Sequence, residues 1–413
     1  MKMIISSILL ITILASCNPT KKLMKENDTS FLEKLMKTKP KQFSYYLANK
    51  DSLRLQIIYT KIIHTKNGQS SFHEYRFNVN DSMYFYPAST VKMPVAFLVL
   101  EKLNELNHPL INKNTTIKTR TYTTSSTTDT TPSTIENYIK QIFLVSDNDA
   151  FNHLYEFLGQ GYIQQKLKEK GYTGAEIRHR LQIFLTPEQN KKTDTVSFYD
   201  SLGNLIRQQL PQYNNNNFPE RKSLVGKGYY KDDQLVHQPF DFSLKNRIYL
   251  EDLHHILQSV LFPETVPPQQ RFNLTDEDYQ FLYKWMSSYP RESKKPKYDS
   301  VKYWDAYAKF LLYGEEKKPV IKNIRIFNKV GDAYGFLTDV AYVVDRKKNV
   351  EFMLSATLLC NEKGIFNNDD YQYTTVGLPF MKNLGRLIYD YEIKNNRSKN
   401  RVIPERFLID YGE

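Results

Sequence analysis

Residues 86–101 read YPASTVKMPVAFLVLE, and this stretch decides the fold that we expect. From Ser89 onward the residues are mostly apolar, which predicts a long helix that is buried on all sides. Pro94 falls in the first turns, where a helix tolerates proline best. Ser89 and Lys92 are three residues apart and therefore share one face of the expected helix. The stretch predicts a buried helix with a hydroxyl and an amine side by side at its start.

A serine and a lysine placed in this way can act as a nucleophile and its base. A neutral lysine can take the proton of the hydroxyl, and burial or nearby positive charge lowers a lysine pKa toward that state. Backbone N–H groups at a helix start can also hold a developing oxyanion. The pattern arises by chance as well, and Ser89 equally fits a plain helix N-cap. Taken alone, the motif leaves both interpretations open.

A second motif, Ser146-Asp147-Asn148, lies between two expected helices at 133–145 and 150–158. In a functional interpretation, Ser146 relays a proton and Asn148 forms a hydrogen bond with a substrate amide. In a structural interpretation, Ser146 and Asp149 form a capping box for the second helix.

A third motif, Lys329-Val330-Gly331, directly follows an expected strand at 324–328. Glycine lets a ligand approach the strand edge closely, and the lysine supplies a positive charge that can hold a carboxylate. Similar Lys-Gly pairs also occur at Lys227 and Lys363. The position at the strand end favours Lys329.

In this order, the three motifs together resemble the class A β-lactamase family of penicillin-recognising serine hydrolases. Residues 334–341 resemble the strand that returns after the third motif, and residues 192–195 resemble the Asp-Thr segment after the family's active-site loop. The resemblance covers about 43–198 and 247–393. It implies that Ser89 is acylated and that Lys92 is its base or proton shuttle. It further implies that Ser146 and Lys329 form a second proton path and the carboxylate anchor. Asn148 would contact the substrate amide, and the N–H groups of Ser89 and Asp332 would form the oxyanion hole.

Two departures from the family pattern bear on turnover. The family has a glutamate on the active-site loop that activates the deacylating water, whereas the nearest match here is Gln182, which cannot act as a general base. Glu188 is an alternative, displaced in sequence but close in space. Val330 replaces the usual hydroxyl residue, which removes a hydrogen bond worth about 1.5–3 kcal/mol to a charged partner.

The wider pattern predicts an α/β (α+β) fold of the β-lactamase/transpeptidase-like type: an antiparallel sheet domain flanked by helices, plus an inserted all-helical domain. Strands are expected in the first and last parts of the chain and helices between them. Residues 199–247 are interpreted as an insertion with hairpin character and Asn-rich turns. The expected elements are strands at 55–63, 72–77, 324–328, 338–344 and 351–359, and helices at 248–261, 278–285, 302–313 and 376–393.

The N-terminus has the pattern of a targeting segment. Residues 1–17 combine a positive start, a short apolar run and Leu14-Ala15-Ser16-Cys17, which resembles a bacterial lipobox and implies lipidation of Cys17. An ordinary cleaved signal with an incidental cysteine is the alternative. Residues 18–42 are expected to be a tether, 43–395 the hydrolase domain and 396–413 a tail. The protein is therefore expected in the bacterial cell envelope, anchored to the membrane through Cys17.

Composition limits the remaining choices. The 413 residues carry a net charge of +12, but the lysines are scattered, so we expect a solvated surface and no nucleic-acid partner. The 2 cysteines exclude a disulfide framework, and we expect Cys360 to be a buried strand thiol and no metal or cofactor to be required. The leading hypothesis is a serine hydrolase that forms an acyl-enzyme with β-lactams or related peptidoglycan-like amides. The alternatives are a D-Ala-D-Ala peptidase or other amidase or esterase, and a non-catalytic cell-wall-binding lipoprotein.

Overall fold

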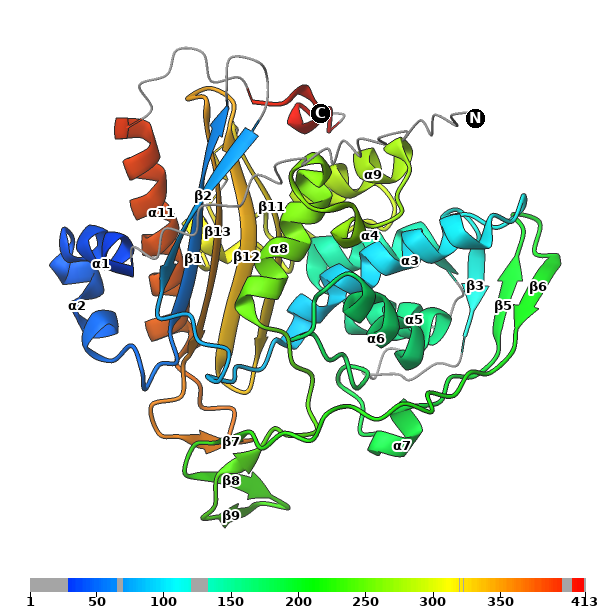
Figure 1. Ribbon diagram of the computed structural model, residues 1–413, viewed down its shortest axis with the longest axis horizontal. Helices are drawn as coiled ribbons and strands as arrows, with labels where there is room; N and C mark the ends of the chain where they lie inside the picture. Colours follow the sequence, from blue (N-terminus) through cyan, green and yellow to red (C-terminus); the bar gives the residue numbers. More distant parts are fainter. Residues whose placement is uncertain are drawn as a thin grey trace, which may run out of the picture.

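A five-stranded antiparallel sheet forms the centre of the molecule (Figure 1). The computed structural model describes residues 29–64, 70–119, 133–318, 320–321, 323–395 and 403–411. The strand order is β11-β12-β13-β1-β2, so strands from the two ends of the chain pair in one sheet. Their bounds are Gln56–His64 (β1), Ser70–Phe77 (β2), Ile324–Ala333 (β11), Phe336–Asp345 (β12) and Val350–Leu359 (β13).

Helices cover both faces of this sheet (Figure 1). Every residue of β12 and β13 is buried, which explains why these strands are mostly apolar on both faces. One face packs on α1 (Thr29–Lys37), α2 (Pro40–Ala48), α10 (Phe310–Tyr313) and α11 (Leu378–Asn395). The other face packs on α8 (Leu250–Leu261) and α9 (Asp276–Ser287) and adjoins the helical domain.

The helical domain is built around α3 (Lys92–Leu106), whose first twelve residues are all buried. Around α3 lie α4 (Ile135–Val145), α5 (Asn148–Leu158) and α6 (Gln160–Glu169). A four-stranded sheet in the order β4-β3-β5-β6 covers the outer side of this domain. Its strands are β3 (Thr116–Lys118), β4 (Ser133–Thr134), β5 (Val196–Tyr199) and β6 (Leu205–Gln209). The expected combination of a helix-flanked antiparallel sheet and an inserted helical domain is confirmed.

Two segments that the sequence placed outside the domain are part of it. Residues 29–42 were expected to be tether, but they contribute to α1 and α2, and Leu32 and Met36 are 1% and 0% exposed. Residues 403–411 were expected to be tail, but Phe407 is fully buried against the rings of Phe262 and Tyr342. In both cases apolar side chains cover core that would otherwise face water.

The prediction of a helix at 302–313 is largely wrong. Only Phe310–Tyr313 is helical, and Leu311 and Leu312 within it have non-helical backbone angles, with φ of 75° at Leu312. These side chains are buried against α11, so packing of the turn overrides local helix propensity. The described helices include none long and apolar enough to span a membrane. Cys17 and the expected signal segment lie outside the described residues.

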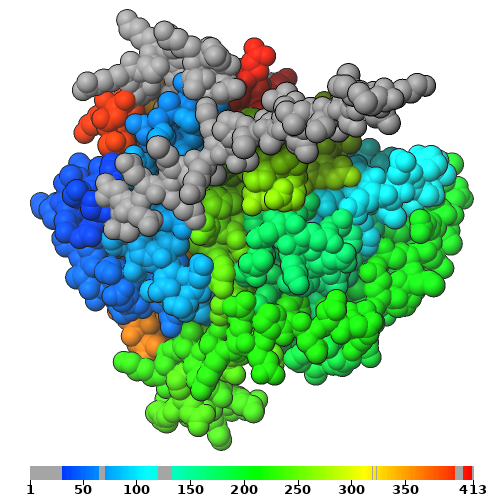
Figure 2. Space-filling model, viewed as in Figure 1, coloured from blue at the N-terminus to red at the C-terminus, as the bar shows by residue number. Residues whose placement is uncertain are grey.

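Region 199–247 forms short strands and turns between the two domains. A hairpin of β8 (Gly228–Lys231) and β9 (Gln234–Val236) confirms the expected hairpin character. The hairpin pairs with β14 (Ile365–Phe366), and β7 (Leu224–Val225) pairs with β10 (Phe240–Asp241). This part projects at the lower edge of the molecule (Figure 2). The turn α7 (Pro187–Asn190) lies nearby, on the loop that leads into β5.

Candidate active site

Ser89 lies in a short 3-10 turn, Ala88–Val91, that leads directly into α3. Ala88 has a φ of 46°, a left-handed conformation that is uncommon for a residue other than glycine and that is often found at functional sites. Ser89 makes no capping hydrogen bond to the helix, so the plain N-cap interpretation is wrong. Its Oγ lies 2.9 Å from Lys92 Nζ. The expected pair of hydroxyl and amine is formed.

Lys92 is fully buried, and its amine has a set of partners that suits the neutral form. Nζ contacts the carbonyl oxygen of Ser146 and lies 2.7 Å from Asn148 Oδ1, and both oxygens can only accept. A neutral amine has two protons for these acceptors and one lone pair left for the hydroxyl of Ser89. Burial lowers the Lys92 pKa to about 7, although the carboxylates of Asp147, Asp332 and Asp149 favour the charged form.

Ser146 connects two lysines. Its Oγ lies 3.3 Å from Lys92 Nζ and 2.7 Å from Lys329 Nζ. Ser146 ends α4 with a φ of 59°, and Asp147, not Ser146, caps α5 by accepting from the Ala150 N–H at 2.8 Å. The capping-box interpretation of Ser146 is therefore wrong, and its hydroxyl instead forms hydrogen bonds with Lys92 and Lys329.

Lys329 is 2% exposed and comes from β11, so the sheet carries it to the helical domain. Burial, together with the charge of Lys92, holds the pKa of Lys329 well below its usual range. Side chains from α3, the α4–α5 junction and β11 thus form one continuous polar chain, in the order Ser89, Lys92, Ser146, Lys329.

Gly331 places β11 against the turn that carries Ser89. A β-carbon at this position would lie 2.6 Å from Pro87 O and 2.9 Å from the nitrogens of Ser89 and Thr90. These are backbone atoms, which cannot rotate away. The close approach therefore brings the backbone of Asp332 beside that of Ser89, where an oxyanion hole is expected, and only glycine permits it.

Replacing Gly331 by alanine should separate the strand from the turn. We expect Gly331→Ala to slow acylation of Ser89 by about 10²-fold, because a displacement of about 1 Å is enough for such a loss. The overpacking should also cost about 1–3 kcal/mol of stability. Mass spectrometry of acylation and thermal unfolding measure the two effects. Gly203→Ala is the control. It strains the backbone, because Gly203 has a φ of 84°, but no atom lies within 4 Å of the new β-carbon. Equal acylation by the two variants would contradict the role given to Gly331.

The loop after α6 is fixed to the helical domain at its two ends. Arg180 is 1% exposed, and its Nε donates to Glu156 Oε1 at 2.7 Å. Leu181 and Asn152 of α5 exchange two hydrogen bonds, of 2.9 and 3.0 Å. Asn190 Oδ1 accepts from the Arg180 N–H at 3.1 Å. These bonds determine where the next residue, Gln182, lies.

Gln182 contacts Asn148, a partner of Lys92. Its Oε1 accepts from Asn148 Nδ2 at 2.6 Å, and its backbone is left-handed, with a φ of 56°. Gln182 therefore lies on the cavity wall beside Asn148. Glu188 does not take that place: its carboxylate accepts from the Tyr213 hydroxyl at 2.7 Å and lies 3.8 Å from Lys191.

His179, on the same loop, does not replace the glutamate as a base. Its Nε2 accepts from the Asn246 N–H at 3.2 Å, and its Nδ1 lies 2.6 Å from the Arg180 carbonyl oxygen. Burial lowers the His179 pKa to about 4, and the charges of Lys245 and Arg178 act in the same direction. The ring is neutral, and both of its nitrogens are engaged.

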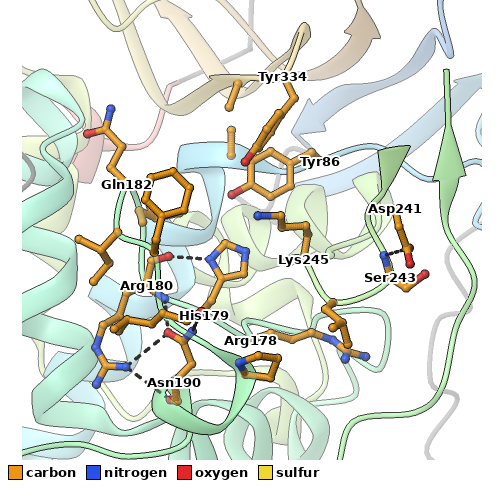
Figure 3. A pocket seen from close by; sticks show the side chains of 18 of the residues that line it. Tyr86, Arg178, His179, Arg180, Gln182, Asn190, Asp241, Ser243, Lys245 and Tyr334 are labelled. Atoms are coloured by element: carbon orange, nitrogen blue, oxygen red, sulfur yellow. Dashed lines mark hydrogen bonds between the residues drawn. The ribbon is translucent and has the colours of Figure 1, made fainter. Parts of the chain in front are cut away.

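A large cavity opens beside Ser89. Its volume is about 1370 Å³, more than a small drug-sized ligand needs. Ser89, Asn148 and Gln182 lie on its wall, whereas Lys92, Ser146 and Lys329 do not line it. Sequence reasoning missed several lining residues that come from distant segments: Tyr86, Phe218, Leu244, Lys245, Tyr334 and Tyr371. Figure 3 shows part of this cavity.

Part of the chain matches a known protein family. Residues 46–218 match the model of the beta-lactamase enzyme family. The match contains Ser89, Lys92, Ser146 and Asn148 and extends into region 199–247, while Lys329 lies outside it. No curated protein matches the chain.

Solved structures of β-lactamases and of PBP-A are similar to this chain. A variant of the TLA-1 extended-spectrum β-lactamase has a TM-score of 0.51 at 13% identity, over 88% of this chain and 99% of that one. A class A β-lactamase of Bacteroides cellulosilyticus DSM 14838 has a TM-score of 0.48 at 12% identity, over 88% and 99%. PBP-A has a TM-score of 0.48 at 14% identity, over 90% and 98%. The likeness to the TLA-1 variant shows a fold of the β-lactamase type.

Two side chains near the site have structural roles. Val330 is 3% exposed and packs in the core on the α11 side, so this departure from the family pattern fills the core. Cys360 follows β13, is fully buried and free, and burial raises the pKa of its thiol far above the usual range. The expectation of a buried thiol is confirmed, although Cys360 lies one residue beyond the strand.

Proposed function

We propose that the protein is a serine hydrolase that forms an acyl-enzyme at Ser89 with β-lactams or related amides. The observation that carries the proposal is the buried contact of Ser89 Oγ with Lys92 Nζ, at 2.9 Å, beside an open cavity. The neutral amine takes the hydroxyl proton while Oγ attacks the amide carbonyl carbon. The N–H groups of Ser89 and Asp332 hold the oxyanion that develops.

The remaining residues position the substrate and move the proton. Ser146 passes a proton between Lys92 and the departing nitrogen of the amide. Its Oγ lies 3.3 Å from Lys92 Nζ and 2.7 Å from Lys329 Nζ. Lys329 donates a hydrogen bond to the substrate carboxylate, without a second one from the hydroxyl that is usual at position 330. Asn148, on the cavity wall, donates to or accepts from the substrate amide.

Deacylation is expected to be slow. Water must be activated by a base to attack the acyl-enzyme, and Gln182 cannot accept a proton at neutral pH. The presence of Gln182 in place of a glutamate also favours a second candidate function on the same fold. This is a peptidase, amidase or esterase that transfers or releases its acyl group slowly. A non-catalytic binder is disfavoured, because the buried set of Ser89, Lys92, Ser146 and Lys329 is connected throughout.

Labelling with a fluorescent penicillin tests this proposal. The adduct should map to the tryptic peptide 77–92, which lies between Arg76 and Lys92 and contains Ser89. An adduct on another peptide would exclude Ser89 as the nucleophile. We also propose that the protein works at the bacterial cell envelope, held through Cys17, which the lipobox-like sequence supports.

The acylation rate should depend on pH through Lys92. Only the neutral amine is a base, and burial lowers the Lys92 pKa to about 7. The rate is therefore expected to be low in acid, to rise as the pH increases through about 7, and to level off above it. Quenched mass spectrometry from about pH 5 to about pH 9 measures this profile. A rate that falls as the pH rises would contradict Lys92 as the base.

A further inference from the structure

Lys245 enters the cavity from region 199–247, which the motif resemblance does not cover. It follows β10 in the chain and is half-buried, and it lines the same cavity as Ser89. Its Nζ lies 5.5 Å from the ring centroid of Tyr334. In Figure 3 the side chain lies between the Tyr86–Tyr334 pair and the ring of His179. The ammonium group thus faces into the cavity.

The charge of Lys245 is not neutralised by any described carboxylate at ion-pair distance. Other basic residues on the cavity wall differ in this respect. Arg178 and Arg221 both pair with Glu176, at 2.6 and 2.8 Å. Asp241, the acid nearest in sequence, accepts from the Ser243 N–H at 2.8 Å. His179 beside Lys245 is neutral, as argued above. A half-buried cation in this position suits an anionic partner.

Ser89 lies on the cavity wall, whereas Lys92, Ser146 and Lys329 do not line the cavity. The proposed function, on which this step rests, assigns the substrate carboxylate to Lys329. The part of the substrate that enters the cavity is therefore its acyl side chain. We propose that Lys245 binds an anionic group at the end of that side chain, which makes it a specificity-determining residue.

The walls around Lys245 favour an acyl chain with an apolar stem. Tyr86 and Tyr334 pack edge to face with centroids 5.2 Å apart. Leu244 and Phe184, which also line the cavity, are 60% and 102% exposed, so their apolar surfaces are available to a ligand. The chemistry that fits is an amide whose acyl group has an apolar stem and ends in a carboxylate.

Three amides of aminopenicillanic acid with six-carbon side chains test this inference. Adipoyl ends in a carboxylate, hexanoyl in a methyl and aminohexanoyl in an ammonium group. Their binding to the full-length chain carrying Ser89→Ala is measured by calorimetry, so that no acylation is needed. A charged hydrogen bond predicts that adipoyl binds about tenfold or more tightly than hexanoyl, and aminohexanoyl weakest.

Variants at Lys245 then identify the source of the preference. Lys245→Gln should abolish it and Lys245→Glu should reverse it. Lys118→Gln is the control, because Lys118 is exposed and does not line the cavity, yet its loss changes the net charge equally. Equal or undetectable binding of the three amides, or a preference that survives Lys245→Gln, would overturn the inference. Acylation of Ser89 is measured separately, in the unsubstituted protein. If Ser89 is acylated but adipoyl binds no more tightly than hexanoyl, only the Lys245 subsite is refuted. If adipoyl binds more tightly but Ser89 is not acylated, only the proposed function is refuted.

Discussion

Gln182→Glu should convert a long-lived acyl-enzyme into one that turns over. Gln182 Oε1 already accepts from Asn148 Nδ2 at 2.6 Å, so a glutamate can keep this contact and its position. The substitution adds the one missing element, a carboxylate that can accept a proton from water. General-base catalysis contributes about 10²–10⁴-fold, and we expect the deacylation rate to rise by that amount with the acylation rate little changed. Decay of the acyl-enzyme mass after removal of excess penicillin measures it.

A control on the same loop separates this effect from a general change in charge. Gln189 Oε1 also accepts a hydrogen bond, from the Thr186 N–H at 2.8 Å, and its exposed side chain belongs to the α7 cap. Gln189→Glu therefore makes the same chemical change away from Asn148 and should leave deacylation unaltered. If Gln182→Glu deacylates no faster than Gln189→Glu, the position of Gln182 is not that of the missing base.

Ser89→Ala should remove covalent labelling altogether. The hydroxyl is the only atom at that position that can bond to the acyl group, and loss of a catalytic serine lowers rates by about 10⁶-fold. Lys92→Met should slow acylation by a comparable amount, because the two residues act as one unit. Both variants are compared with Ser82→Ala, a serine in an exposed turn outside the cavity, by penicillin labelling. Labelling of Ser89→Ala at the rate of Ser82→Ala would show that another residue is the nucleophile.

The candidate catalytic residues could be predicted because their arrangement is largely local or tied to regular elements. Ser89 and Lys92 meet through the spacing of one helical turn, and the bend at Ser146 follows from two adjacent helices. Lys329 was found because it ends a strand pattern, although its contact with Ser146 spans 183 residues of sequence. Gln182 was recognised from the motif, while its bond to Asn148 required the folded loop.

Other features depend on tertiary packing. Lys245 carries no motif, and only pairing of β7 with β10 and packing of their loop beside Tyr334 bring it to the cavity. The burial of Phe407 depends on partners far away in the chain. The helix α1 did leave a signal: Leu32 and Met36, four residues apart, form a buried face, but the surrounding lysines obscured it.

The measurement that tests the central claim most directly is an intact-mass time course of the full-length chain after addition of benzylpenicillin. The account predicts a single adduct of the mass of the intact penicillin, located at Ser89, which forms faster above about pH 7 and decays slowly. Absence of an adduct at saturating penicillin, or an equal adduct on Ser89→Ala, would contradict it.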